Sequence, residues 1–245
     1  MFSTDSRVIL LAAAALIGSA GTALAQGTVV RAGGPSARAY PVGKSIAPSA
    51  KIALVAGDTL TVLDGRGTRT LRGPGSFNVS GAAVAPDKRG TFTSLISTQN
   101  RKQSRTGAVR GDGKPARSPN LWYVDVRTPA TVCVADPAKI ELWRPDMQKA
   151  QTLTVRNDAS GKTGSAAWAM GKSSLAWPAA VPFADGASYT LSWSGATAPI
   201  QIRLVAFDPA AAGDPATLAE ALHARGCAAQ FDLLANSMEG APAAP

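Results

Sequence analysis

Apolar and polar residues alternate over short distances along most of this chain, which is the pattern of β-strands. From Val29 to Val79, short apolar runs such as 52–55 are separated by turn residues. Asp64-Gly65 lies between two of these runs and predicts a hairpin with a type I′ turn, whose two central residues need positive φ. A Gly-Pro-Gly sequence at 73–75 predicts a second turn. Closely spaced turns are typical of all-β structure, so residues 26–97 are predicted to form a small β domain.

A second group of short strands follows, from Leu121 to Phe207. Its last member, residues 200–207, alternates apolar and polar side chains through Arg203. About seven strands in such a span predict a β-sandwich of the Ig-like type over residues 121–208. The chain's tryptophans all lie in this half, and we expect most of them in its core: Trp122, Trp143, Trp168, Trp177 and Trp193.

The C-terminal pattern changes to helical spacing. Asp214-Pro215 pairs a capping side chain with proline at the first helical position, which marks a helix start. Leu218 and Leu222 lie on one apolar stripe, and Gly226 is expected to interrupt it before a second helix. Residues 214–236 are therefore predicted to form a short helical appendix on the sandwich, followed by a disordered tail at 237–245.

The N-terminus has the order of features found in a secretory signal peptide. Arg7 precedes an unbroken apolar run of roughly 10 residues, whereas a membrane-spanning helix needs about 20. Ala23-Leu24-Ala25 then places small residues where a signal peptidase reads. We expect residues 1–25 to be cleaved after Ala25 and the mature chain to be periplasmic or secreted, with an uncleaved anchor as the alternative. No later stretch is expected to span a membrane.

Two cysteines, Cys133 and Cys227, occur in the chain. In an oxidising compartment an even number of cysteines makes a disulfide the default expectation. Cys133 lies in a predicted strand and Cys227 in the predicted terminal helices. A bond between them would therefore pin the helices to the sandwich.

Positive charge is concentrated in the middle of the chain. Residues 66–117 contain eleven basic and two acidic side chains, a net +9 that equals the net charge of the whole protein. Within them, residues 98–120 contain Val109 as their single large apolar residue, so they are predicted to form a flexible basic linker. Guanidinium and ammonium groups bind phosphate and carboxylate. The candidate contacts for an anionic partner are Arg101, Lys102, Arg105, Arg110, Lys114 and Arg117.

Catalytic, cofactor and metal sites are not predicted. The one histidine, His223, lies in a predicted helix without a recognisable catalytic motif around it, and general-base chemistry near neutral pH usually needs such a group. A zinc site needs three or four suitable ligands at characteristic spacings, which one histidine and two distant cysteines do not supply. Three Gly-Lys-[Ser/Thr] triplets, at 43–45, 161–163 and 171–173, lack the earlier glycine of a phosphate-binding loop.

Residues 51–79 (KIALVAGDTLTVLDGRGTRTLRGPGSFNV) resemble the periplasmic domain of FecR-type regulators, in which short strands alternate with Gly-Asp and Asp-Gly turns. The resemblance implies an all-β, non-catalytic module that relays signals or binds partners or glycans. The chain departs from these regulators because it has neither an inner-membrane helix nor a cytosolic anti-sigma domain.

Three functions are compatible with these features. The first is an exported, non-enzymatic binding or accessory module that docks to an envelope protein, anionic lipid, lipopolysaccharide or glycan. The second is a carbohydrate-binding or hydrolytic protein that uses exposed Trp122, Trp168 or Trp177 as a stacking platform, and the third is a purely structural envelope protein. Nucleic acid fits the charge but not the compartment, and the basic segment contains no interleaved aromatic residues.

Overall fold

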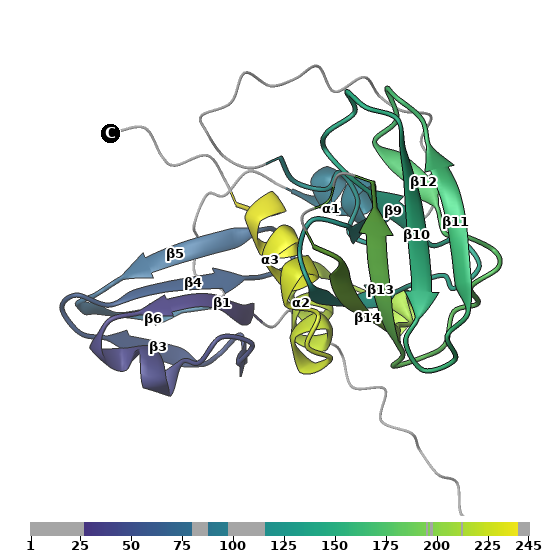
Figure 1. Ribbon diagram of the computed structural model, residues 1–245. Helices are drawn as coiled ribbons and strands as arrows, with labels where there is room; N and C mark the ends of the chain where they lie inside the picture. Colours follow the sequence, from purple (N-terminus) through teal and green to yellow (C-terminus); the bar gives the residue numbers. More distant parts are fainter. Residues whose placement is uncertain are drawn as a thin grey trace, which may run out of the picture.

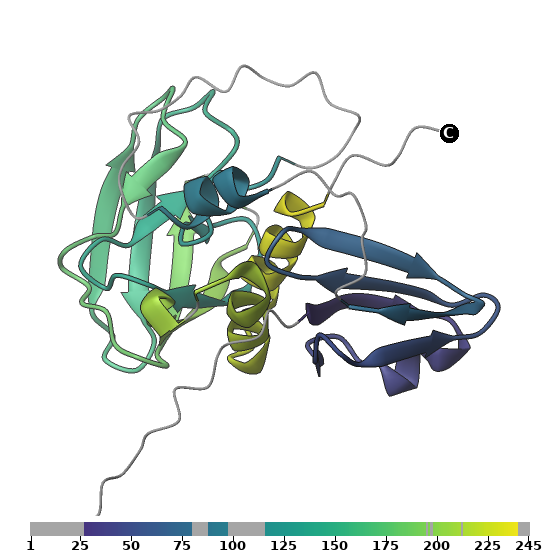
Figure 2. The same ribbon diagram turned by 180° about the vertical axis from the view of Figure 1, so that it is seen from behind.

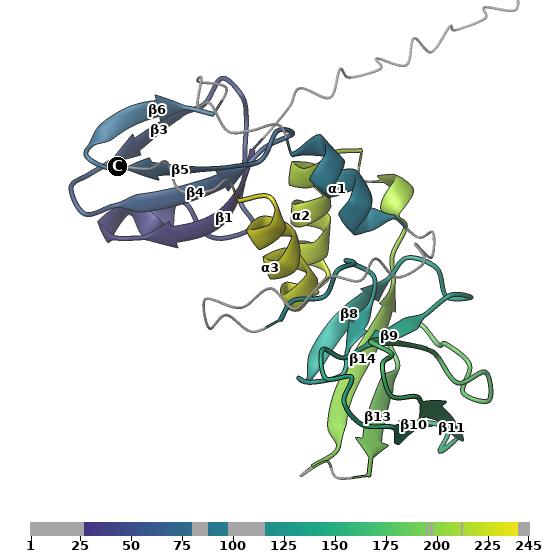
Figure 3. The same cartoon turned by 90° about the horizontal axis from the view of Figure 1, so that it is seen from above.

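The computed structural model describes residues 27–79, 88–97, 116–194, 196, 198–211 and 213–239. The fold is mainly β, as the alternation predicted, with two β parts on either side of a group of helices (Figures 1 and 3). The predicted signal peptide and most of the predicted basic linker lie outside the described residues, as does the end of the predicted tail, 240–245.

The N-terminal β part contains two small sheets. A four-stranded sheet has the order β2-β1-β4-β5, and a two-stranded sheet pairs β3 with β6. Its strands are β1 (Gly27–Gly33), β2 (Ser45–Ile46), β3 (Lys51–Leu54), β4 (Thr59–Leu63), β5 (Thr68–Arg72) and β6 (Gly75–Asn78), with a 3-10 helix η1 at Pro35–Ala39. The alternating apolar residues of these strands form one core: Val29, Ile46, Ile52, Leu54, Leu60, Val62, Leu71 and Val79.

The turn between β3 and β4 is built around a buried carboxylate, Asp58. Its Oδ2 accepts a hydrogen bond from the Val55 amide at 2.7 Å, and its Oδ1 accepts one from the Ser36 amide at 2.9 Å. Gly57, with φ of +86°, makes the reversal possible. Hydrogen bonds from Ser36, first from its side chain and then from its backbone, hold the pKa of Asp58 below its usual value. One side chain therefore fastens η1 to the β3–β4 turn.

The predicted hairpin between β4 and β5 is confirmed, but the predicted turn type is wrong. The loop has four residues, and the Asp64 amide donates to the Gly67 carbonyl at 3.0 Å. The Asp64 side chain accepts from the Arg66 and Gly67 amides at 2.8 and 3.1 Å. Among the described residues only glycines have positive φ, so Asp64 does not adopt the conformation that a type I′ turn demands. The carboxylate closes the loop instead.

The C-terminal β part contains two further sheets. One has five strands in the order β11-β10-β13-β14-β8, and the other has three in the order β12-β9-β7. The strands are β7 (Val124–Asp125), β8 (Ala130–Val134), β9 (Glu141–Trp143), β10 (Gln151–Asn157), β11 (Thr163–Trp168), β12 (Ser174–Ala176), β13 (Ser188–Trp193) and β14 (Ile200–Ala206). Side chains from both sheets meet in one core, including Leu142 of the smaller sheet and Val155, Leu191 and Leu204 of the larger. We call this set the sandwich core.

Three α-helices occur in the described part of the chain: α1 (Arg89–Ile96), α2 (Pro215–Ala224) and α3 (Ala228–Ser237); a short 3-10 helix, η2, spans Pro209–Ala211. The predicted start of α2 is confirmed, because Asp214 Oδ1 accepts hydrogen bonds from the amides of Ala216 and Thr217. Gly226, with φ of +74°, separates α2 from α3 as predicted. None of the helices described here combines the length and hydropathy of a membrane span.

Helices α2 and α3 lie between the two β parts (Figures 1 and 2), and a third core forms there from residues of both β parts and the helices. Val30 and Leu63 enter it from the N-terminal sheet, Leu95 from α1, and Trp122 and Phe207 from the C-terminal β part. The remaining buried members come mostly from α2 and α3: Leu121, Cys133, Leu218, Ala219, Leu222, Cys227, Phe231, Leu234, Ala235 and Met238. We call this set the helical joint. The helices thus contact both β parts, which is more than an appendix of the sandwich.

Backbone and side-chain hydrogen bonds reinforce the helical joint on its N-terminal side. Thr28 Oγ1 donates to the Ala216 carbonyl at 2.9 Å, and both groups are buried. The Thr68 amide donates to the Met238 carbonyl at 3.1 Å. Arg31 also pairs with Glu239 just beyond α3. These contacts hold β1 against the start of α2 and the end of α3, and they hold β5 against the end of α3.

The C-terminal side of the helical joint is held by the two cysteines and by Gln230. Cys133 on β8 and Cys227 at the start of α3 lie at disulfide distance, with their Cα atoms 5.8 Å apart. The buried Gln230 amide accepts from the Cys133 amide at 2.7 Å and donates to the carbonyls of Cys133 and Leu121 at 2.8 and 2.9 Å. Gln230 therefore occupies the free edge of β8 as a neighbouring strand would.

Candidate functional site

A groove of about 180 Å³ lies between residues 116–132 and α3. It is bordered by Arg117 and Arg127 on one side and by Asp232, Leu233 and Asn236 of α3 on the other. Arg117 is exposed. It is the one member of the predicted anionic-partner set that lies within the described residues; Arg101, Lys102, Arg105, Arg110 and Lys114 lie outside them.

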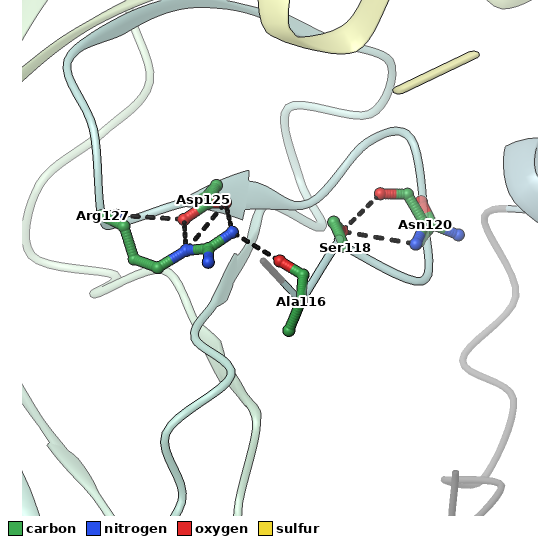
Figure 4. A network of polar contacts seen from close by, with 5 residues as sticks. All are labelled: Ala116, Ser118, Asn120, Asp125 and Arg127. Carbon is green, nitrogen blue, oxygen red and sulfur yellow. Dashed lines mark hydrogen bonds and ion pairs between the residues drawn. The ribbon is translucent and has the colours of Figure 1, made fainter. Parts of the chain in front are cut away.

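An arginine–carboxylate pair shapes one wall of the groove (Figure 4). Arg127 Nε donates to Asp125 Oδ1 at 2.9 Å, and its terminal nitrogen donates to Oδ2 at 2.6 Å. The same guanidinium donates to the Ala116 carbonyl at 2.8 Å and stacks 4.9 Å from the centre of the Trp143 ring. The hydrogen bonds that Arg127 donates to Asp125 raise the pKa of Arg127. The pair therefore holds Ala116, the first residue of the predicted linker 98–120 that the structure describes.

The C-terminal end of residues 116–120 is hydrogen-bonded to the end of α1. Asn120 donates through Nδ2 to the Ser97 carbonyl at 2.7 Å. Ser118 Oγ donates to the Asn120 carbonyl, as Figure 4 shows. The Trp122 indole donates to the Ile96 carbonyl at 2.9 Å. Residues 116–120 are therefore held by specific hydrogen bonds, unlike the flexible loop expected for them. Because Asn120 is hydrogen-bonded to Ser97, the chain before residue 98 and the chain after residue 115 lie close together beside the C-terminal end of α1.

A group of three described cations lies at the opposite end of α1. The Lys88 amide donates to the Arg66 carbonyl at 3.1 Å, which brings the β4–β5 loop against the start of the helix. Arg66 and Arg89 are exposed, and Lys88 is half-buried. The first turn of α1 contains no acidic residue, and the N-cap makes no side-chain hydrogen bond. We call Arg66, Lys88 and Arg89 the cationic cluster; it combines three positive charges with the positive end of a helix dipole.

The cationic cluster was not named among the predicted contacts, although its members belong to the basic stretch 66–117. Sequence spacing separates Arg66 from Lys88 by more than twenty positions. The long-range hydrogen bond from the Lys88 amide to the Arg66 carbonyl brings them together. The adjacent Lys88 and Arg89, which follow Asp87, are the one signal in the sequence that could have drawn attention to this end of the segment.

The tryptophans lie largely in the protein interior, as predicted. Trp122, Trp143 and Trp168 are buried, and Trp177 and Trp193 are half-buried. Trp122 belongs to the helical joint and Trp168 to the sandwich core. The exposed stacking platform considered for Trp122, Trp168 and Trp177 is therefore absent at the first two positions.

His223 is exposed on α2, where its ring lies 5.4 Å from that of Phe231. It also packs against Gly43, since a Cβ at that glycine would fall 2.1 Å from the imidazole. Within the described ranges, no three His, Cys, Asp or Glu side chains gather as a metal site would require. The contacts of His223 with Gly43 and Phe231 give the imidazole a packing role between the turn before β2 and α3.

Comparison of the chain with protein-family models, curated proteins and solved structures finds no match, so the interpretation of its site rests on its own residues.

Proposed function

We propose that this chain is an exported, non-enzymatic binding module that docks to an anionic partner of the bacterial envelope. The observation that carries the proposal is the cationic cluster, where Arg66, Lys88 and Arg89 converge at the N-terminal end of α1. Helix N-termini and arginine forks both favour phosphate and carboxylate groups. Five further basic residues occur in the sequence at 98–115.

The proposed domain identities follow from the same features. We propose a FecR-like domain in the N-terminal β part and an Ig-like sandwich in the C-terminal one. In this arrangement the helical joint holds the two parts together and presents α1 at the boundary between them. Docking by a rigid joint, with no catalytic group required, is consistent with an accessory role.

The docking experiment measures binding of the mature chain to vesicles of phosphatidylglycerol and of phosphatidylcholine by co-sedimentation. Changing Arg66, Lys88 and Arg89 together to Ser should weaken binding to the anionic vesicles. Lys149, Lys162 and Lys172, which are exposed on the sandwich, provide a matched control that removes the same charge. Wild-type binding should also fall with added salt, because the screening length is about 10 Å at 0.1 M.

Two results would overturn the docking proposal. One is equal loss of binding in the triple variant and in the Lys149, Lys162, Lys172 control, which would mean that net charge alone is responsible. The other is undiminished binding of the triple variant at low salt. Export is tested separately by the intact mass of the exported protein, which should begin at Gln26; retention of residues 1–25 would contradict it.

A further inference from the structure

A second cavity, of about 330 Å³, opens between the 137–141 turn and residues 176–183 of the C-terminal β part. Its apolar wall includes the half-buried rings of Trp177 and Phe183 together with Val181 and Pro182. Its ionisable residues are Lys139 and Glu141. A cavity of this size that combines apolar side chains with a few charged groups can hold a small ligand.

Glu141 occupies a defined position at this cavity. Along β9 the side chains alternate, so that Leu142 enters the sandwich core while Glu141 points to the opposite face. The pairing of Leu142 with Val124 places Tyr123 beside Glu141 on one side, and Ala176 is its partner on the other. Glu141 also lines a smaller cavity of about 30 Å³ that includes Trp122 and Tyr123.

The negative charge of Glu141 has no counterpart in the described part of the chain. Neither a hydrogen bond nor an ion pair joins its carboxylate to another described residue. The nearby ammonium group of Lys139 is 3.3 Å from Asp136, so a different carboxylate already pairs with it. Burial raises the pKa of Glu141. Burial, together with the charge of Glu141, also raises the pKa of Tyr123. Both shifts indicate that negative charge is poorly solvated here.

We infer that this cavity binds an alkylammonium group, with Glu141 as its counter-ion and the rings of Trp177 and Phe183 as its walls. A cation would restore the solvation that the half-buried carboxylate lacks, and ammonium groups are attracted to the faces of aromatic rings. The ammonium group belongs either to a free amine or to a lysine side chain of a peptide. The inference is independent of the proposed docking function, since Glu141 and the cationic cluster lie on different elements.

The inference is tested by NMR on the isotopically labelled mature chain, with n-butylammonium and Nα-acetyl-lysine amide as probes. Either probe should shift the Trp177 indole resonance and lower the measured pKa of Glu141. A Glu141→Gln variant should bind at least about tenfold more weakly, as expected when a charge-assisted hydrogen bond is lost. Asp232→Asn is the matched control, because it removes one exposed carboxylate from α3. The tighter of the two probes identifies the source of the ammonium group.

The neutral analogue n-butanol separates charge recognition from simple occupation of an apolar cavity. Equal binding of n-butanol and n-butylammonium, or a preference for a neutral monosaccharide, would overturn the inference. So would a Glu141 pKa that stays constant at saturating probe, a measurement that needs no variant. Vesicle binding by Glu141→Gln should equal that of the wild type, which keeps failure of this inference distinct from failure of the docking proposal.

Discussion

The sandwich core and the helical joint are assembled in different ways. Every buried member of the sandwich core lies between Val124 and Leu204, so this core is built from one continuous stretch of chain. The helical joint instead spans positions from Val30 to Met238 and takes residues from both β parts. The apolar side chains of the sandwich core are buried by residues of their own stretch of the chain. Val30 and Leu63 of the N-terminal sheet are buried only when the C-terminal helices pack against them.

The two cores also differ in how far apart in sequence their buried polar partners lie: Tyr189 of the sandwich core bonds to the nearby Pro182 and Ala184, whereas the partners in the helical joint are distant. The helical joint encloses Gln230 and is bordered by the buried hydroxyls of Thr28 and Thr68, each with a specific partner. It also contains the pair Cys133 and Cys227. Directional and covalent contacts define one orientation, which apolar packing alone defines less strictly. The joint therefore combines burial with a fixed geometry, and substitutions there should have the widest consequences.

The largest effect is expected from removing the cysteine pair. Changing Cys133 and Cys227 to Ala opens a loop with a sequence separation of 94. In the chain-entropy model, losing a cross-link over such a loop costs about 4–5 kcal/mol. The free energy of unfolding from urea denaturation of the wild-type and double-Ala proteins measures this loss. Two thiols that titrate in the denatured, non-reduced wild type would contradict the bond.

The next effect tests the helical joint against the sandwich core by removing one fully buried leucine from each. Leu234→Ala in α3 and Leu191→Ala in β13 should each destabilise the protein by about 2–5 kcal/mol. Because Leu234 lies in the shared core, its loss should shift the far-UV circular dichroism and tryptophan fluorescence transitions together. Separation of the two transitions in wild-type protein would mean that the N-terminal sheet unfolds independently.

A smaller effect is expected at Gln230. Gln230→Met keeps most of the side-chain volume but leaves the Cys133 amide and two carbonyls without their buried partners. We expect a loss of about 2–3 kcal/mol, the range for unsatisfied buried polar groups. Thermal unfolding of this variant gives the value. A change no larger than that of an exposed substitution such as Asp232→Asn would show that water replaces the amide without cost.

The smallest of these effects concerns the pH dependence contributed by Asp58 in the N-terminal β part. Its folded pKa lies below the value of about 3.9 expected in the unfolded chain. Its stabilising contribution is therefore present above that pH and is lost as the pH falls through the folded pKa. Asp58→Asn should flatten the acid limb of the stability profile, measured by urea unfolding between neutral and acidic pH. An unchanged acid limb would assign the dependence to other carboxylates.

How far the sequence predicted this structure differs from region to region. Strand alternation, the Asp214-Pro215 helix start and the inward tryptophans depend on local patterns, and all three were predicted. Helix α1 was not predicted, because its sequence RGTFTSLI contains glycine and two β-branched threonines that disfavour an isolated helix. It forms where Leu95 packs into the helical joint, with Phe92 and Ile96 against it. That contact depends on residues more than a hundred positions away.

The candidate sites likewise depend partly on local sequence and partly on contacts between distant residues. Charge content identified the basic stretch 66–117, but the meeting of Arg66 with Lys88 depends on a single long-range hydrogen bond. Glu141 was not singled out, because a lone glutamate in a strand looks like an ordinary solvent-facing residue. Its significance comes from the cavity beside it and from the lack of a partner among the described residues, and only the assembled fold supplies these.

Native-state hydrogen exchange tests most directly whether the helical joint unites the two β parts. The amide of Val29 is bonded to the Lys44 carbonyl in the N-terminal sheet, while those of Val155 and Leu191 lie in the sandwich. If the joint makes the chain one cooperative unit, the slowest amides of both parts should exchange with the same free energy of opening, and Leu234→Ala should lower both equally. Exchange of the N-terminal sheet at a much lower free energy, unaffected by Leu234→Ala, would contradict the account.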